Sequence, residues 1–561
     1  MIAIALIAWL GLVSIESGPT ETADLILKNG NFYALSGSTK LIAALAAKHG
    51  KIIFVGDLEG AMALAEPETQ VVDLLGATVV PGLIDAHMHL DGVGFEAMQL
   101  NLKGVASLSE LLKLVAREAA QAAPGAWITG RGWIETHWTP ARFPTRGDLD
   151  AVSADHPVWL RRVDGHGAVA NSKALALAGI TRDAPANPLG GEIVRAENGE
   201  PTGMLLDNAQ ELVERLLPAP TAEQKREAFR RGAELYAKRG WTGVHVAGTT
   251  LADSRLLATL VEEGQIPIRI YSAVYGPGED ADALLAEGPV GIAAFARFTR
   301  RAVKVSFDGA LGSMGAAMLE PYCHVDSTGH GFLKYEDAPL AKMFDAALKA
   351  GIQIEVHAIG DRANRHILDL YQAAFERVAP PLRKVPEPRW RVEHAQILAP
   401  VDIPRFAQLG VIPSMQPSHA ISDLHFAASR IGVDRLVGAY AWRSLIDSGA
   451  QIAGGSDAPV EAGDPRIEYY AAVARRDQQG FQGPEWHPEQ SVSRLEGLLM
   501  LTKWAARAAF QEDWLGSLEV GKACDLSVFN RDLLKIAPAE ILTSECLLTV
   551  VGGRIVHRAG L

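Results

Sequence analysis

The middle of the chain repeats one pattern: a short apolar run ends in polar residues and is followed by an amphipathic stretch. This alternation is typical of parallel βα units, because a strand covered on both faces reads as a continuous apolar run. Eight such runs are TVVPGLIDAHMH, TGVHVAG, IPIRIYSAVYG, RAVKVSFDGA, GIQIEVHAIG, PRWRVEHAQIL, GVIPSMQPSH and AQIAGGSDAP. They predict an α/β fold, a (β/α)8 TIM barrel over residues 78–511.

Residues 94–238 separate the first apolar run from the second, which is far longer than an ordinary connection of a few residues. This stretch has strand-like runs of its own, AWITGRGW and PVWLRRVDG. We therefore expect a large insertion after the first barrel strand, and we interpret it as a lid over one face of the barrel.

The two ends of the chain share a different pattern, short β-rich runs punctuated by glycine and asparagine. Residues 23–77 and 512–561 are expected to pair into one small β-sandwich domain. Residues 1–22 begin with an apolar run of about thirteen residues, which suits a signal peptide and is too short to span a bilayer. Although no basic residue precedes that run, we expect a secreted or periplasmic protein, the alternative being a cytoplasmic one.

Composition and charge narrow the classes of function. The chain has 561 residues, 48% of them hydrophobic, which is enough for a large core. A net charge of −13 has the wrong sign for binding a phosphate backbone, so we expect no nucleic-acid partner. No later segment is long and apolar enough for a membrane span. The three cysteines are far apart in sequence, so a metal would have to be held by histidine and carboxylate.

Side chains that bind metals stand at the ends of several predicted strands. His87 and His89 end the first run, His357 the fifth and His394 the sixth, and Asp457 follows the eighth. Because side chains alternate along a strand, the first two share one face. A single histidine is more often a packing residue. Together, at the barrel end that carries active sites, the five predict a metal centre.

A cation held there would lower the pKa of a bound water towards about 7 and polarise a carbonyl group. Asp457 is the expected general base and then the acid that protonates the leaving amine, and His394 is the other expected catalytic residue. Besides an amide, the same site could hydrolyse a carbamate, a lactone or another ester. A regulatory protein without activity is the alternative of another class.

The ordered ligand set resembles that of the amidohydrolase superfamily, and the similarity extends from the N-terminal β-rich segment to LGSLEVGKACDLSVF. The motifs DGHGAVANSKAL, VKVSFDGALGS, HAIGDRA, RVEHAQ, PSMQPSH and GSDAPV resemble the branch called amidohydrolase family 3, which includes N-substituted formamide deformylase. The resemblance implies hydrolysis of a non-peptide carbon–nitrogen bond, most directly in an N-acyl or N-formyl amide.

The resemblance also implies one or two metal ions, usually Zn²⁺, with Fe, Mn or Co as alternatives. His87 and His89 would hold the more buried ion, His357 and His394 the more exposed one, and Asp457 would touch the first ion. Lys304 lies in the fourth run, at the position where relatives carry a lysine carbamate that bridges two metals. A carbamylated Lys304 is the expectation and an unmodified structural lysine the alternative.

Three further residues are candidates for binding the substrate. His166 lies in the insertion, within DGHG, and His419 follows the seventh apolar run. Trp133, in GRGWIETHW, is the third, with packing inside the insertion as its alternative. The partner we expect is a small organic amide enclosed by the insertion, and a homodimer is the default oligomeric state.

Overall fold

A computed structural model describes residues 22–37, 42–135, 138–162, 167–188, 191–323, 329–483 and 485–561. Its centre is an eight-stranded parallel sheet in the order β20-β19-β18-β17-β16-β15-β14-β7. These strands are β7 (Leu83–Met88), β14 (Trp241–Thr249), β15 (Arg269–Tyr275), β16 (Phe298–Ser306), β17 (Gln353–Ala358), β18 (Arg391–His394), β19 (Ile412–Met415) and β20 (Ala453–Gly454). Each comes from one of the eight predicted apolar runs, so the barrel is confirmed.

The barrel is nearly closed, and hydrogen bonds just beyond its edge strands join its two ends. The backbone N–H groups of Ser456 and Asp457, after β20, donate to the carbonyl of His87 on β7, at 3.2 and 2.6 Å. This contact brings the end of the last strand against the end of the first.

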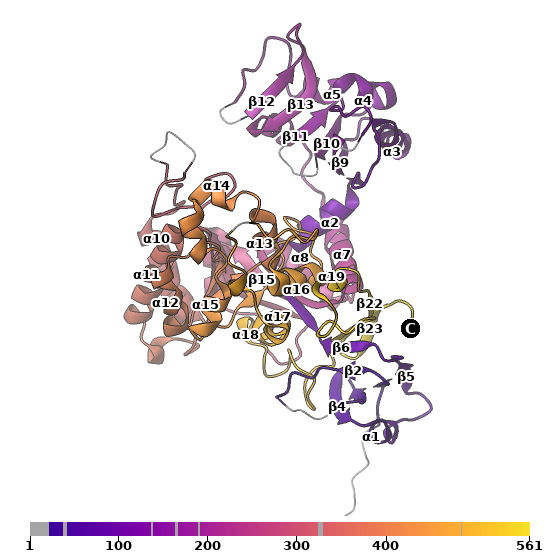
Figure 1. Cartoon of the computed structure of the whole chain (residues 1–561), viewed down its shortest axis with the longest axis vertical. Coiled ribbons are helices and arrows are strands. Elements are labelled where there is room, and N and C mark those ends of the chain that lie inside the picture. Colours follow the sequence, from indigo (N-terminus) through magenta and orange to yellow (C-terminus); the bar gives the residue numbers. More distant parts are fainter. Residues whose placement is uncertain are drawn as a thin grey trace, which may run out of the picture.

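Helices cover the outside of the barrel (Figure 1). In α11 (Asp361–Arg377), Ile367, Leu368 and Tyr371 recur at helical spacing and are buried against the sheet, which explains why this segment is helical. The other outer helices are α8 (Leu251–Glu262), α9 (Glu279–Glu287), α10 (Asp337–Ala350), α12 (Ile403–Leu409), α15 (Trp442–Asp447) and α18 (Lys503–Ala508). Four further helices complete this part, α13 (Pro417–Asp423), α14 (Ala427–Ile431), α16 (Pro465–Ala474) and α17 (Arg494–Met500).

Both chain ends contribute to a pair of sheets beside the barrel. One sheet has the order β4-β3-β1-β5, and the other has the order β2-β6-β21-β22-β23, which joins N-terminal and C-terminal strands. These strands are β1 (Leu25–Lys28), β2 (Asn31–Phe32), β3 (Ala44–Lys48), β4 (Lys51–Gly56), β5 (Gln70–Asp73), β6 (Thr78–Pro81), β21 (Leu526–Phe529), β22 (Cys546–Val551) and β23 (Arg554–Arg558), with short helices α1 (Leu58–Met62) and α19 (Pro538–Ile541). Leu27, Val72, Leu526 and Leu548 share one core between them.

The first predicted barrel strand is divided in two. β6 pairs with β21 in the terminal sheet, and only β7, after Gly82, enters the barrel. A Cβ on Gly82 would lie 2.3 Å from Oγ1 of Thr242, so the chain passes this point only because glycine has no side chain. Residues 78–81 therefore belong to the terminal sheet, although the apolar run continues through them.

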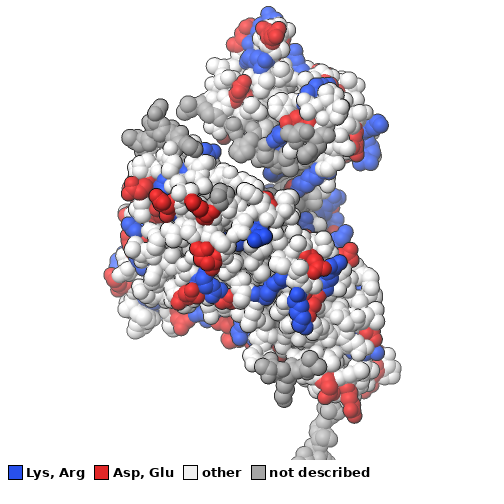
Figure 2. All heavy atoms as spheres, in the orientation of Figure 1, with Lys and Arg blue, Asp and Glu red and all other residues white. Residues whose placement is uncertain are grey.

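The insertion has its own six-stranded sheet, in the order β12-β13-β11-β10-β9-β8. Its elements are β8 (Leu100–Asn101), α3 (Leu108–Gln121), β9 (Ile128–Trp133), α4 (Arg146–Ser153), β10 (Val158–Arg162), β11 (Gly167–Ala170), α5 (Ser172–Leu177), β12 (Gly191–Arg195), β13 (Pro201–Asp207) and α6 (Glu211–Glu214). Figure 1 shows this unit standing off the barrel, and Figure 2 shows a hollow between the two on the face in view.

Two helices form the neck between insertion and barrel, α2 (Leu90–Met98) and α7 (Ala222–Arg239). They cross so closely that a Cβ on Gly94 would lie 1.8 Å from the carbonyl oxygen of Ala228. Because α7 also packs on β14 and on the terminal sheet, it forms part of the barrel wall. The separate unit is thus shorter than the expected 94–238.

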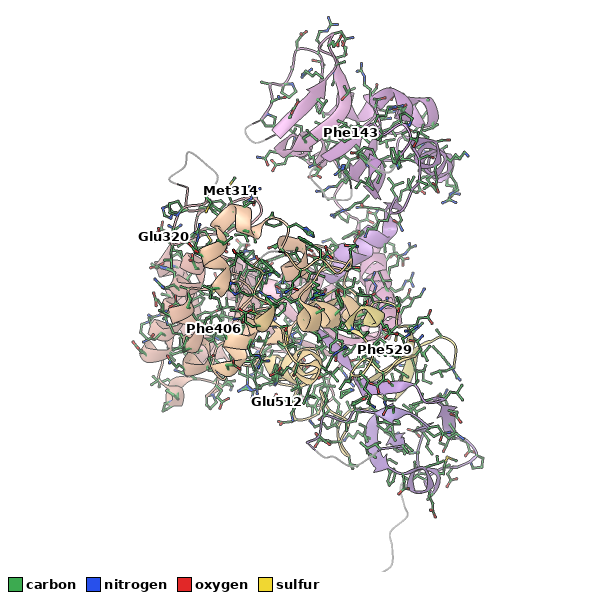
Figure 3. The ribbon with its side chains drawn as sticks, in the orientation of Figure 1. Phe143, Met314, Glu320, Phe406, Glu512 and Phe529 are labelled. Atoms are coloured by element: carbon green, nitrogen blue, oxygen red, sulfur yellow. The ribbon has the colours of Figure 1, made fainter. Side chains whose placement is uncertain are left out.

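Side chains fill each of these units, as Figure 3 shows with Phe143 on the insertion, Phe406 in the outer helical layer and Phe529 on the terminal sheet. The expected signal peptide, residues 1–22, falls almost entirely outside the described residues. Within the described part of the chain, no helix combines the length and the apolar character that a membrane crossing requires.

Candidate metal centre

Metal-binding side chains from three strand ends meet in the barrel. His87 on β7, His394 at the end of β18 and Asp457 after β20 each offer one ligand atom, and these atoms lie within 4.8 Å of one another. All three residues are buried. His89 Nε2 lies 3.1 Å from Oδ1 of Asp457, and the ring of His357 lies 4.5 Å from that of His394, between centroids. The structure therefore brings the five predicted ligands together.

Lys304 reaches the same place from β16. Its Nζ lies 3.3 Å from Nε2 of His87, and its side chain is buried. Burial lowers the pKa of Lys304, although the carboxylates of Glu393 and Asp457 oppose this shift. Lys304 therefore points into the barrel, towards the predicted ligands.

The donor set fits a divalent cation. Asp457 Oδ1 and His357 Nε2 are buried polar atoms without a hydrogen-bond partner among the described residues. Two ligands that each lie about 2.1 Å from one tetrahedral ion are about 3.4 Å apart. Nε2 of His87 lies 3.4 Å from Oδ1 of Asp457, which matches this spacing. Imidazole nitrogen and carboxylate oxygen are ligands that zinc and other first-row metals accept.

Electrostatics keep the ligands in the forms that bind metal. Burial by itself raises the pKa of Asp457, but the contacts with His87 and His89 outweigh it, so the pKa of this carboxyl lies well below its usual value. Burial lowers the pKa of His394 well below the ordinary value, and His357 and His87 lower it further. The aspartate is thus ionised and the imidazole neutral.

Two ligands sit in strained backbone. His394 has φ +74° and Asp457 has φ +57°, both in the left-handed region that residues with a Cβ seldom occupy. Such conformations persist only where the surrounding structure enforces them, and they concentrate at functional sites.

A second set of side chains orients the ligands. Glu393 accepts a hydrogen bond from Nδ1 of His87, and Gln416 accepts one from Nδ1 of His394 at 2.7 Å. Arg391, which is completely buried, holds Glu393 with hydrogen bonds of 2.7 and 3.0 Å. Partners of this kind fix the tautomer and direction of a ligating histidine. The sequence predictions missed these partners, although the two-residue spacing of Arg391 and Glu393 along β18 already places both on one face of the strand.

Asp85 ties the first strand to the loop that carries Asp457. It accepts hydrogen bonds from the backbone N–H of Ser456 at 2.9 Å, from the Ser456 hydroxyl at 2.6 Å and from Tyr236 at 3.1 Å. Burial raises the pKa of Asp85 to about 6, although these hydrogen bonds oppose the shift. Tyr236 comes from α7, so the neck helix also supports the metal centre.

The three candidate substrate residues have different outcomes. His419 on α13 lies at the centre, with Nε2 3.5 Å from Oδ2 of Asp457 and its ring stacked on His394. His166 lies outside the described residues. Trp133 requires a correction: its side chain has no exposed surface, and its Nε1 donates to the Leu160 carbonyl at 3.0 Å within the insertion's hydrophobic core. An indole enclosed in this way packs the insertion and does not line a substrate pocket.

A cavity of about 400 Å³ lies beside the loop after Asp457. Pro459 and Glu461 line it from the barrel, Val93 and Leu235 from the neck helices, and Arg131 from the insertion. The cavity lies where the insertion, the neck and the barrel meet. Its lining includes Ala458, the residue that follows Asp457.

A parallel barrel with a buried His, His, Asp cluster at its strand ends is the architecture of a metal-dependent hydrolase. The profile described as "Amidohydrolase family" matches residues 70–557, which is most of the chain. The chain belongs to the amidohydrolase family.

The chain is similar to individual relatives over nearly their whole length. Protein LONG AFTER FAR-RED 3 of Arabidopsis thaliana is 34% identical over 559 residues, covering 97% of this chain and 94% of that protein. N-substituted formamide deformylase of Arthrobacter pascens is 29% identical, covering 95% and 98%. The crystal structure of an uncharacterized metal-dependent hydrolase from Pyrococcus horikoshii OT3 superposes with a TM-score of 0.73 at 28% identity, covering 92% and 99%.

Proposed function

We propose that this hydrolase cleaves a non-peptide carbon–nitrogen bond in a small organic amide, an N-acyl or N-formyl amide, with Zn²⁺ as its cofactor. The observation that carries the proposal is the convergence of ligand atoms from His87, His394 and Asp457 within 4.8 Å. The full-length similarity to the Arthrobacter pascens N-substituted formamide deformylase supports the choice of an amide.

When bound, zinc supplies a Lewis acid and lowers the pKa of its water to about 7. His87, His89, His357, His394 and Asp457 would hold it. Glu393 and Gln416 keep the imidazoles of His87 and His394 turned towards the site.

Asp457 carries out the proton transfers. Its carboxylate is ionised, so it accepts a proton as water oxygen forms a bond to the amide carbon. It then returns that proton to the amide nitrogen as the carbon–nitrogen bond breaks, because an amine leaves far more readily than an amide anion. The products are a carboxylic acid and an amine. His419, facing Oδ2 of Asp457 at 3.5 Å, is placed to donate a hydrogen bond to the carbonyl oxygen.

Lys304 gives the site a sixth ligand in our proposal. An ammonium group 3.3 Å from a ligand nitrogen would be repelled by a cation at that nitrogen. The neutral amine can instead add to carbon dioxide, forming a nitrogen–carbon bond and releasing one proton, and the resulting carbamate is an anionic oxygen ligand. This supports a second zinc ion. Intact mass measurement in bicarbonate buffer, with Lys304→Gln as the control, tests for an addition the mass of one carbon dioxide.

The test of function combines metal analysis with a substrate panel. Purified protein is analysed for metal and assayed against N-formyl amines, N-acyl amines, carbamates, lactones and esters. We expect bound zinc and amide turnover, and a loss of at least about a hundredfold in kcat for Asp457→Asn. Asp345→Asn, which changes a partly exposed carboxylate paired with Arg377, is the matched control and should retain wild-type turnover.

Two results would overturn the proposal. Turnover confined to lactones or carbamates would assign the site to a different bond. No turnover of any compound, after zinc has been restored, would favour a regulatory role on this fold.

A further inference from the structure

Two stacked histidines in the metal centre face different ends of a glutamine side-chain amide, one the oxygen and the other the nitrogen. The rings of His394 and His419 lie 5.7 Å apart at 20°. Nδ1 of His394 is 2.7 Å from the oxygen Oε1 of Gln416. Nδ1 of His419 is 2.9 Å from the nitrogen Nε2 of Gln396. A neutral imidazole carries one proton on either Nδ1 or Nε2, so the neighbour of Nδ1 decides what Nε2 can do.

The orientation of the Gln416 amide is set by its own partner. Its Nε2 donates to the Ser414 carbonyl at 3.2 Å, which leaves Oε1 to face His394. An oxygen only accepts, so Nδ1 of His394 carries the proton. Nε2 of His394 then presents a lone pair, as a metal ligand must.

The surroundings of His419 favour the other tautomer. Its Nε2 lies 3.5 Å from Oδ2 of Asp457, and a carboxylate attracts an N–H but repels a lone pair. With the proton on Nε2, Nδ1 is an acceptor, which matches the N–H of Gln396 that faces it.

We propose that Gln416 and Gln396 impose opposite tautomers on this pair, making His394 a metal ligand and His419 a hydrogen-bond donor to the substrate carbonyl oxygen. Gln396 is a positioning residue, because it acts only through His419. Its side chain is buried, 4% exposed, so bulk water does not supply an alternative partner. The role of the donor rests on the proposed amide hydrolysis, whereas the tautomers themselves do not.

The same substitution at the two positions gives opposite expectations. Glutamate has the shape of glutamine but offers only oxygen. In Gln416→Glu the bond to the Ser414 carbonyl is lost, but the atom facing His394 stays an acceptor, so the tautomer of His394 should be retained. In Gln396→Glu the donor is lost and a carboxylate faces Nδ1, while Asp457 still faces Nε2, so His419 should gain a proton on Nδ1 and become an imidazolium. This cation beside the metal centre should weaken zinc binding and lower kcat by about ten- to a hundredfold, with little change in KM.

The primary readout is the ring-nitrogen NMR spectrum of the full chain labelled with ¹⁵N-histidine, with and without zinc. His419 is identified by the signals that are missing in His419→Gln. We expect a protonated Nε2 in the wild type and a protonated Nδ1 in Gln396→Glu. In Gln396→Met the new side chain has a similar size but neither the amide donor nor the amide acceptor. This variant shows whether the added charge of glutamate causes the fall in kcat, and we expect kcat to fall in Gln396→Met as well. Gln478→Glu, at an exposed position, is the control for activity.

A protonated Nδ1 on His419 in the wild type would overturn the proposal. So would an unchanged tautomer and unchanged kcat in both Gln396 variants. If the wild type hydrolyses none of the amides, the proposed function fails, but the spectra of the wild type and Gln396→Glu still decide the tautomers.

Discussion

Glu393 accepts a hydrogen bond from Nδ1 of His87, and this contact directs Nε2 of His87 to within 3.4 Å of Asp457. The contact joins β18 to β7 inside the barrel, across 306 residues of sequence. Arg391 holds the carboxylate from its other side, so the charge of Glu393 is balanced although it is completely buried. The buried ion pair of Arg391 and Glu393 therefore positions His87, a predicted metal ligand.

Glu393→Gln should weaken zinc binding by about ten- to a hundredfold, because the amide makes His87 a poorer base and leaves Arg391 with one carboxylate fewer. Competition with a chromogenic chelator measures this. Glu387→Gln, an exposed residue paired with Arg507, should bind zinc as the wild type does. Unchanged affinity in Glu393→Gln would show that His87 needs no such partner.

Gly94→Ala should disturb the neck. The new Cβ would lie 1.8 Å from the Ala228 carbonyl oxygen, which forces α2 and α7 apart and costs about 1–3 kcal/mol. We expect a lower thermal midpoint and faster proteolysis between insertion and barrel. Gly147→Ala on α4 is the control, because the nearest atom to its Cβ is 3.9 Å away and alanine favours a helix. Equal behaviour of the two variants would contradict the crowding.

Asp525→Asn should loosen the terminal sheets from the barrel. Arg269 on β15 donates to both oxygens of Asp525, at 2.6 and 2.9 Å, and both side chains are buried. Removing one charge of a buried pair costs about 3–5 kcal/mol, so the urea midpoint should fall clearly. Asp345→Asn removes an exposed ion pair and should change stability by less than about 1 kcal/mol. Similar shifts of the urea midpoint in both variants would argue against a role of the Arg269–Asp525 pair in joining the terminal sheets to the barrel.

Asp148→Asn should weaken the start of α4 in a manner that depends on pH. Arg142 donates to both carboxylate oxygens at 2.7 and 2.8 Å, and with Thr145 this lowers the pKa of Asp148 from 3.8 to about 2. A pKa lowered on folding stabilises the folded state above the unfolded value, and this stabilisation is lost as the pH falls towards about 2.

Hydrogen exchange of α4 should therefore be faster in Asp148→Asn than in the wild type near pH 7, because the free energy of opening the helix falls by about 1 kcal/mol. The exchange rates of the two proteins should converge as the pH approaches 2. Asp155→Asn, an exposed residue just after the same helix, should match the wild type throughout. A difference that persists at low pH would assign the effect to shape instead of charge.

Local spacing in the sequence was sufficient to predict the barrel and the group of side chains that meets at its strand ends. Apolar runs mark buried parallel strands, and the two-residue period of a strand places His87 and His89 on one face. Active sites of such barrels form at the carboxyl ends of the strands, so His357, His394 and Asp457 could be grouped without knowing a single contact.

Only the tertiary structure decided which side chains support these ligands. Tyr236 reaches Asp85 across 151 residues, and Gln416 and Gln396 face their histidines from other strands and loops. Trp133, the last residue of β9, proved to be core because it packs in the insertion's hydrophobic cluster and donates to the Leu160 carbonyl on β10. The first apolar run was divided because Gly82 passes against Thr242. A sequence period fixes the face on which a side chain lies, whereas the partner across that face depends on how distant segments pack.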